Sequence, residues 1–164
     1  MQNHWKLIDE HGKEHLAKQV ILTLPQEQTN ELVKDLNTGF QIIENQMKPC
    51  FTVMLGLKES PIFKHSGYVL HNPIVSWCAN ETSKQRELNN NGLTLLTLQT
   101  TEIYGMNNFQ KYKENKDHIL NEILNEFLDT FKIDESEVVH KQVHGWLYAY
   151  SEPTNAEIFI VFYR

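Results

Sequence analysis

Two short segments carry the side chains of this sequence that are best suited to bind a planar or anionic ligand. Residues 77–84 read Trp-Cys-Ala-Asn-Glu-Thr-Ser-Lys, and residues 144–149 read His-Gly-Trp-Leu-Tyr-Ala. In an extended strand, alternation places His144, Trp146 and Tyr148 on one face. Three amphipathic rings on one face could form a wall for a planar aromatic ligand, through stacking and hydrogen bonds. A sheet face packed under a helix is the alternative, and composition alone favours it.

A polar group follows the strand that is predicted around Trp77. Asn80, Ser83 and Lys84 could together hold an anion or a carbonyl oxygen, because an ammonium group and hydrogen-bond donors lie close together in the sequence. A simple turn is the alternative, since Asn, Thr and Ser all favour turns. Taken alone, this segment is better interpreted as a turn.

Motifs of self-sufficient catalysis are absent from the sequence. It contains no G-x-S-x-G, P-loop, H-E-x-x-H or C-x-x-C pattern. Ser66 next to His65 makes only a weak case for a hydrolase. His140 and His144 fall on one side of a strand, but a metal site needs a third ligand, and the sequence points to none. We therefore assign no catalytic residue and no metal site from the sequence.

The composition is that of a single domain spanning residues 1–164. The chain is 40% hydrophobic, with a formal net charge of −6 and a pI near 5.7, unlike the basic surfaces that bind nucleic acid. No run approaches the roughly 18 apolar residues of a membrane span. The N-terminus lacks a signal-peptide pattern. Cys50 and Cys78 lie in apolar runs, which favours reduced, buried thiols and a cytoplasmic location.

The periodicity of the apolar residues predicts the elements that position these segments. Helices are predicted after Pro25, with Leu32, Val33 and Leu36 on one side, at residues 38–47, and at residues 113–131, where the apolar stripe is widest. Strands are predicted at residues 5–9, 17–24, 51–57, 68–70, 74–78, 93–103, 138–150 and 158–163. The sequence thus predicts an α+β fold, a mainly antiparallel sheet of about six to eight strands with two or three helices packed on it.

Four segments, in their order along the chain, resemble the substrate domain of renalase-like, FAD-dependent amine-oxidase-type flavoproteins. Residues 20–25 are similar to that family's V-x-x-A-x-P passage, and residues 48–55 to its y-x-P-C-x-x-x-M/L strand. Residues 77–84 are similar to W-x-A-x-N-x-S-K, and residues 144–149 to H-x-W-R-Y-A. The resemblance covers nearly the whole chain.

This resemblance implies FAD as the cofactor, and oxidation of an amine or a reduced nicotinamide-type substrate by hydride transfer. It departs from the family pattern at Leu147, where the family has arginine, and at Gln85, where it often has proline or glycine. Six residues are implied to face the flavin–substrate cavity: Trp77, Asn80, Lys84, His144, Trp146 and Tyr148.

The glycine-rich pattern G-x-G-x-x-G, which holds the pyrophosphate of FAD in such enzymes, does not occur in the sequence. We therefore expect a substrate domain that by itself is inactive and binds FAD weakly or not at all. Its expected partners are a small-molecule substrate and either a missing FAD-binding domain or a second copy that meets an exposed sheet face, but neither nucleic acid nor a membrane. The alternative is a stand-alone, non-catalytic module that binds a small aromatic ligand or a protein partner.

Overall fold

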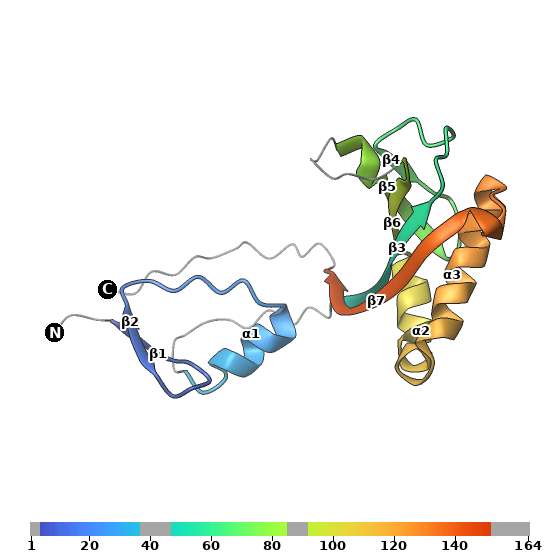
Figure 1. Ribbon diagram of the computed structural model, residues 1–164. Coiled ribbons are helices and arrows are strands. Elements are labelled where there is room, and N and C mark those ends of the chain that lie inside the picture. Colours follow the sequence, from blue (N-terminus) through green and yellow to red (C-terminus); the bar gives the residue numbers. More distant parts are fainter. Residues whose placement is uncertain (1–3, 37–46, 85–91, 152–164) are drawn as a thin grey trace. The chain divides into compact units, whose positions relative to one another are not determined.

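The computed structural model describes residues 4–36, 47–84 and 92–151 (Figure 1). The chain divides into two compact units, one of Met47–Ser151 and one of Met1–Gln46 with Glu152–Arg164. We call these the large unit and the small unit and describe each by itself. The single domain expected from the sequence stays a prediction.

The large unit contains a five-stranded antiparallel sheet. Its strands lie in the order β4-β5-β6-β3-β7, so that β4 and β7 form the two edges (Figure 1). Their bounds are β3 Lys48–Leu57, β4 Gly67–Val69, β5 Val75–Asn80, β6 Thr94–Thr100 and β7 Val138–Tyr150. Together with the two-stranded sheet of the small unit and the three α-helices found among the described residues, this confirms the predicted α+β fold with antiparallel pairing.

Alternation along β3 shows how the sheet separates its two faces. Phe51, Val53 and Leu55 are buried in the core, whereas Met54 between them is 39% exposed. Their partners follow the same rule, since Leu98 opposite Val53 is fully buried. One face of the sheet therefore belongs to the apolar core, and the other carries residues such as Met54.

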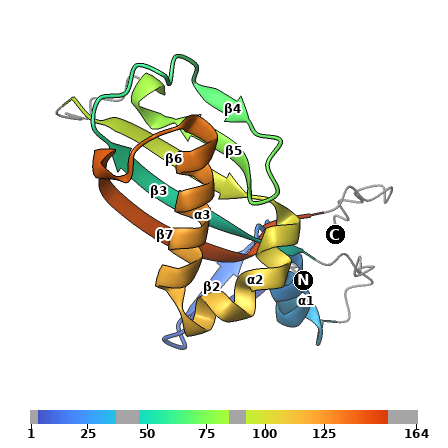
Figure 2. The same cartoon turned by 90° about the vertical axis from the view of Figure 1, so that its right-hand side faces the viewer.

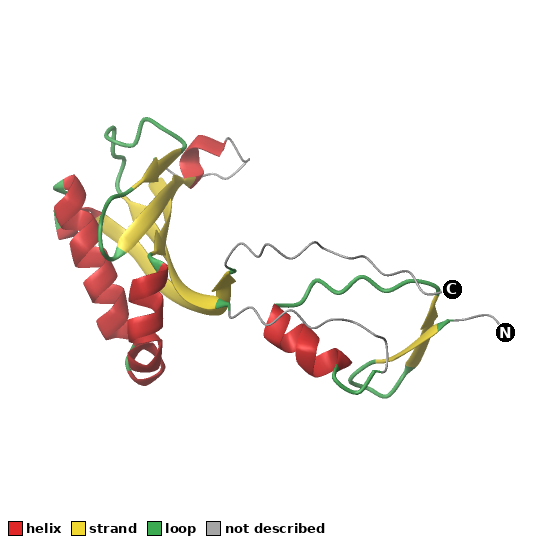
Figure 3. Ribbon diagram, turned by 180° about the vertical axis from the view of Figure 1, so that it is seen from behind, coloured by secondary structure: helices red, strands yellow, loops and turns green. Residues whose placement is uncertain are grey.

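The core face is covered by two helices, α2 Glu102–Glu114 and α3 Lys116–Phe131, which lie on the same side of the sheet (Figures 2 and 3). The side chain of Asn115 caps α3 by accepting a hydrogen bond from the backbone N–H of His118. The predicted stripe is buried, its members being Ile119, Leu120, Ile123, Leu124, Phe127 and Leu128. Burial of each such side chain contributes about 1.5–3 kcal/mol to the free energy of folding. Helix α3 therefore supplies most of the apolar surface that packs on the core face of the sheet.

Helix α2 was not predicted from the sequence, where residues 93–103 were expected to be one strand. The strand ends at Thr100 because Thr101 caps the helix, its side chain accepting a hydrogen bond from the N–H of Tyr104. The buried stripe of α2 consists of Tyr104, Gly105, Asn108 and Tyr112. Glycine, asparagine and tyrosine are weak signals of an apolar helical face. The apolar periodicity of the sequence therefore does not indicate this helix.

The small unit contains a hairpin of β1 Trp5–Ile8 and β2 Glu14–Ala17, followed by helix α1 Gln26–Val33. The strand predicted to continue to residue 24 was wrong, because β1 begins at Trp5 opposite Ala17 and offers nothing further to pair with. Of the apolar side predicted for the helix, Val33 is buried, whereas Leu32 and Leu36 are exposed. The helix predicted at 38–47 lies almost wholly, and the strand predicted at 158–163 entirely, outside the described residues.

Two further sequence expectations concern the chain as a whole. Cys50 and Cys78 are both free and buried, as predicted. Within residues 4–36, 47–84 and 92–151, no helix is long and apolar enough to cross a bilayer.

Candidate functional site

The face of the sheet opposite α2 and α3 carries one continuous row of cross-strand neighbours. Val69 pairs with Trp77, Trp77 with Gln99, Gln99 with Thr52, and Thr52 with His144. Residues directly opposite each other point to the same face, so the row crosses all five strands. We call this surface the open face. Trp77 and His144 stand three strand spacings apart, roughly 14 Å.

Trp146 extends the row at its β7 end. Its indole N–H donates a hydrogen bond to the hydroxyl of Thr52 at 3.1 Å, across the strand boundary. The rings of His144 and Trp146 meet edge to face, with centroids 4.5 Å apart and planes at 62°. Trp146 is nevertheless 52% exposed. Its ring is thus fixed in orientation while much of its surface stays in contact with solvent.

Trp77 forms the aromatic group at the other end. It is 37% exposed, and its ring lies over the backbone of β4 at Gly67. A β-carbon at Gly67 would stand 2.5 Å from Cη2 of Trp77, so only glycine fits beneath this ring. The two tryptophans therefore border a strip of the open face that contains Gln99 and Thr52.

The polar side chains at the end of β5 and just after it, Asn80, Ser83 and Lys84, mainly contact neighbouring parts of the chain. Asn80 is buried, its side-chain N–H donates to the carbonyl of Phe63 at 3.0 Å, and its side-chain oxygen accepts from the N–H of Ser83 at 3.3 Å. The Ser83 hydroxyl donates back to the Asn80 carbonyl at 2.8 Å. These bonds hold the start of the 3-10 turn Glu81–Lys84. The Lys84 ammonium lies 2.7 Å from the Glu81 carboxylate on the same turn.

Tyr148 is separated from the row by an irregularity in the β3–β7 pairing. Trp146 pairs with Cys50 and Tyr150 pairs with Lys48, so that alternation does not run evenly through this stretch. Tyr148 is half-buried. Tyr150 reaches back across the sheet and donates to the carbonyl of Thr100 at 2.9 Å. Burial raises the pKa of Tyr150 to about 12, so its hydroxyl stays protonated and serves as a donor.

Of the six residues expected at the site, the structure brings three onto one row or beside it: Trp77, His144 and Trp146. Sequence reasoning missed Thr52 and Gln99, which connect them. A signal for Thr52 existed, since burial of Phe51 and Val53 implies that Thr52 points the other way. Gln99 needed the strand register, which the sequence does not reveal.

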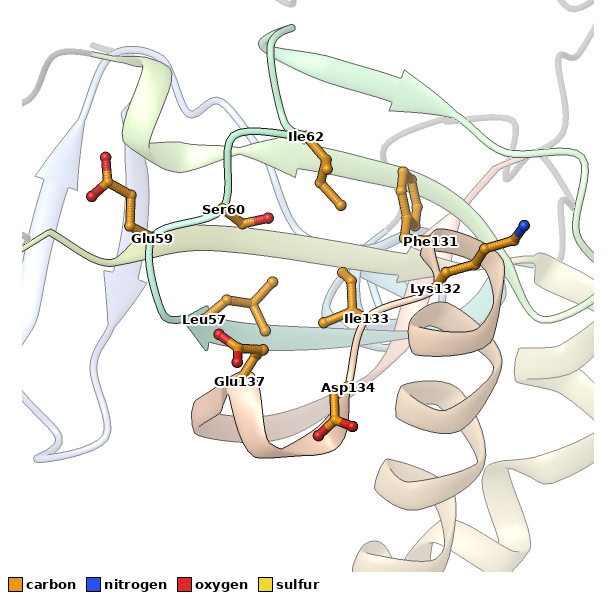
Figure 4. Close-up of a pocket in the computed structure, with 9 residues that line it drawn as sticks. All are labelled: Leu57, Glu59, Ser60, Ile62, Phe131, Lys132, Ile133, Asp134 and Glu137. Carbon is orange, nitrogen blue, oxygen red and sulfur yellow. The ribbon is translucent and has the colours of Figure 1, made fainter.

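A separate cavity of about 240 Å³ opens on the core side, where β3 ends and α3 stops (Figure 4). Leu57, Phe131 and Ile133 form its apolar wall, and Glu59, Asp134 and Glu137 contribute carboxylates. Hydrogen bonds from Ser136 hold the pKa of Asp134 below its usual value, so this carboxylate is ionised at neutral pH. None of the six expected site residues lines this cavity.

The open face offers stacking and hydrogen bonding more than acid–base chemistry. His144 is the titratable side chain of the row, and Thr52 and Gln99 supply polar groups between the tryptophans. Within the part of the chain that the structure describes, no group of three His, Cys, Asp or Glu side chains could hold a metal ion. The arrangement thus suits a planar ligand whose own chemistry the protein would orient.

Comparisons with known proteins give a likeness of fold. No family model matches the sequence, and no curated protein matches it. Among solved structures, the chain is similar to a "putative protoporphyrinogen oxidase" from Exiguobacterium sp. 255-15, with a TM-score of 0.61 and 14% sequence identity. The match covers 92% of this chain and 33% of that chain, so this chain spans about one third of the length of its structural relative. At this identity the match establishes a shared fold.

Proposed function

We propose that the large unit is the substrate-side domain of a flavin-dependent oxidoreductase. Its open face would cover a flavin ring and a substrate when a flavin-binding portion is present. The observation that carries this proposal is the row from Trp77 to His144, which is left uncovered by α2 and α3 and is extended by a half-exposed Trp146. The shared fold with a longer protein described as an oxidase supports it.

The physical case rests on the shape and chemistry of the open face. Indole rings bury a large area and favour offset or edge-on contact with other aromatic rings. The hydrogen bond from Trp146 to Thr52 fixes one ring in advance, which lowers the entropy lost when a planar ligand binds. Gln99 lies exposed between the two tryptophans and could bond the polar edge of such a ligand.

The cofactor in this proposal is FAD, and the substrate class is an amine or a reduced nicotinamide-type compound. FAD would be held mainly by other polypeptide, because a dinucleotide pyrophosphate is bound by a glycine-rich turn and a helix N-terminus, and this sequence has no G-x-G-x-x-G. The chain would then act by orienting rings and excluding water. The partner would be a flavin-binding domain that meets the open face.

The three tryptophans of the chain provide a direct test. Trp77 and Trp146 lie on the open face, whereas Trp5 lies in the small unit and serves as an internal control. We would titrate the full chain with FMN and follow the three indole N–H signals by NMR. The proposal expects saturable shifts for Trp77 and Trp146 that are absent for Trp5. Equal shifts at all three tryptophans, or saturable shifts at Trp5 alone, would contradict a flavin-facing role of the open face.

A further inference from the structure

The open face continues beyond the row from Val69 to His144. A second row lies two residues away along each strand, and a third lies two residues beyond that. The second row consists of Gly67, Ala79, Thr97, Met54 and Gln142, and the third of Leu95, Gly56 and His140. The open face therefore extends along β7 from Trp146 to His140.

The described residues of these three rows include no Asp, Glu, Lys or Arg. This is unusual for a chain that is 22% charged, since a sheet face that meets only water is normally polar. The rows instead carry Trp77 and Met54, both exposed. Surfaces with aromatic and methionine side chains and few charges are typical of those that a partner or ligand covers.

Two histidines are the side chains of the open face that can become charged. His140 and His144 are both exposed on β7, with the exposed Gln142 between them. Four residues of a strand span roughly 13 Å, so an elongated ligand could contact all three side chains. Imidazole gains a positive charge between pH 5 and 8. The three rows can thus become positive but not negative.

The charged side chains next to this stretch lie on the other side of β7. Lys141 is paired with the buried Leu55, so it points away from the open face. Its ammonium lies 3.5 Å from the carboxylate of Glu135, which offsets its charge. The positions of β3 and β6 that face the two histidines are uncharged. No carboxylate of the three rows therefore competes with a ligand for these imidazoles.

We propose that His140 and His144 bind an anionic group, a phosphate or a carboxylate, of the planar ligand that the open face receives. This inference rests on the proposed function for the ring and adds a selection by charge. The side-chain amide of Gln142 is the neutral donor between the histidines. A protonated amine has no carboxylate to pair with on the three rows. Binding of the anionic group should strengthen as the pH falls, because hydrogen bonds from a charged imidazole are stronger.

Titration of the full chain with two simple anions tests this proposal. The probes are inorganic pyrophosphate for a phosphate and glutarate for a carboxylate, and NMR follows the imidazole signals. We expect saturable shifts at His140 and His144 with at least one probe, and the probe that binds identifies the group. The probe's dissociation constant should be at least about threefold lower near pH 6 than near pH 8. His71 and His118, which are exposed outside the three rows, are internal controls.

A pair of variants separates a local site from the charge of the whole chain. Gln142→Glu places a carboxylate between the two histidines and should weaken anion binding at least about threefold. Asn125→Asp adds the same charge on α3, which covers the opposite face, and should leave binding unchanged. Position 125 is exposed, as is position 142, so neither change should disturb the core.

Three results would overturn the proposal. They are equal shifts at His71 and His118, the lack of a saturable shift at His140 and His144 with either probe, and an equal loss of binding in the two variants. The flavin-facing role is measured separately, by FMN at the indole signals. Indole shifts at Trp77 and Trp146 without a response of the histidines to anions would remove the anionic group and leave that role intact.

Discussion

The backbone N–H of Gly145 donates a hydrogen bond to the hydroxyl of Tyr112 at 3.1 Å. A β-carbon at Gly145 would stand 2.7 Å from a ring carbon of the same tyrosine, which leaves no space for a side chain. Gly145 lies between His144 and Trp146 in β7, and it faces the core while they face outward. This contact therefore ties the β7 segment that carries the open-face rings to helix α2.

Gly145→Ala should destabilise the large unit by about 1–3 kcal/mol, the usual cost of forcing an extra carbon into a packed site. Chemical denaturation of the variant would measure the loss. In a Tyr112→Ala background the same change should cost no more than about 0.5 kcal/mol, because the obstructing ring is gone. An equal loss in both backgrounds would mean that the Tyr112 contact is not the cause.

Trp146→Ala should cost little stability, about 1 kcal/mol or less, because the ring is half exposed and loses a single side-chain hydrogen bond. Phe127→Ala, which removes a fully buried ring, is the comparison and should cost about 3–5 kcal/mol. The Trp146 variant should at the same time weaken FMN binding or any association between copies. Denaturation, FMN titration and light scattering on one sample would separate these effects. A large stability loss with unchanged binding and association would mark Trp146 as ordinary core.

The fold was predictable wherever apolar periodicity was strong. Helix α3 shows this, since its stripe from Ile119 to Leu128 is aliphatic or aromatic and uninterrupted by charge at the buried positions. Strand β7 was predicted with its observed bounds. Helix α2 was not predicted because Gly105 and Asn108, which are not strongly apolar, occupy its buried face. The side-chain N–H of the buried Asn108 donates a hydrogen bond to the Tyr104 carbonyl.

The candidate site was predictable in part, because a site on a sheet depends on register as well as alternation. Alternation alone places His144 and Trp146 together, and the structure has them in ring contact. It cannot reveal that Trp77 shares their row, since that depends on two intervening strands. The pairing irregularity after Trp146 likewise has no sequence signature, so the position of Tyr148 could not be derived.

Asn80→Ala should lower the free energy of unfolding by about 1–3 kcal/mol, because it leaves the carbonyl of Phe63 without its donor and the Ser83 N–H without its acceptor. Lys84→Ala is the matched control on the same turn. It should change stability by no more than about 0.5 kcal/mol, because its ion pair is near the surface. Thermal melts would measure both. If Asn80→Ala melted normally but lost the FMN shifts at Trp77, Asn80 would be a ligand-binding residue instead of a structural one.

Asp9 should titrate below the usual range for an aspartate in the folded chain. The hydrogen bond with His15 is the largest cause of this lowered pKa, followed by the backbone N–H groups of Lys13 and His11. A lowered folded pKa means that the ionised carboxylate stabilises the hairpin. That contribution is present above the unfolded pKa and is lost as the pH falls through the lower folded pKa.

His15→Ala should therefore raise the midpoint of the Asp9 titration, measured by NMR at the side-chain carboxyl carbon. Asp134 is the internal control, because its pKa is also lowered, but by hydrogen bonds from Ser136 in the large unit. Its midpoint should not respond to the His15 substitution. An Asp9 midpoint at the ordinary value in the unaltered chain would show that the turn between β1 and β2 does not hold its carboxylate as described. A shift of equal size at Asp134 would show that the substitution acts on the whole molecule and not through the His15–Asp9 contact.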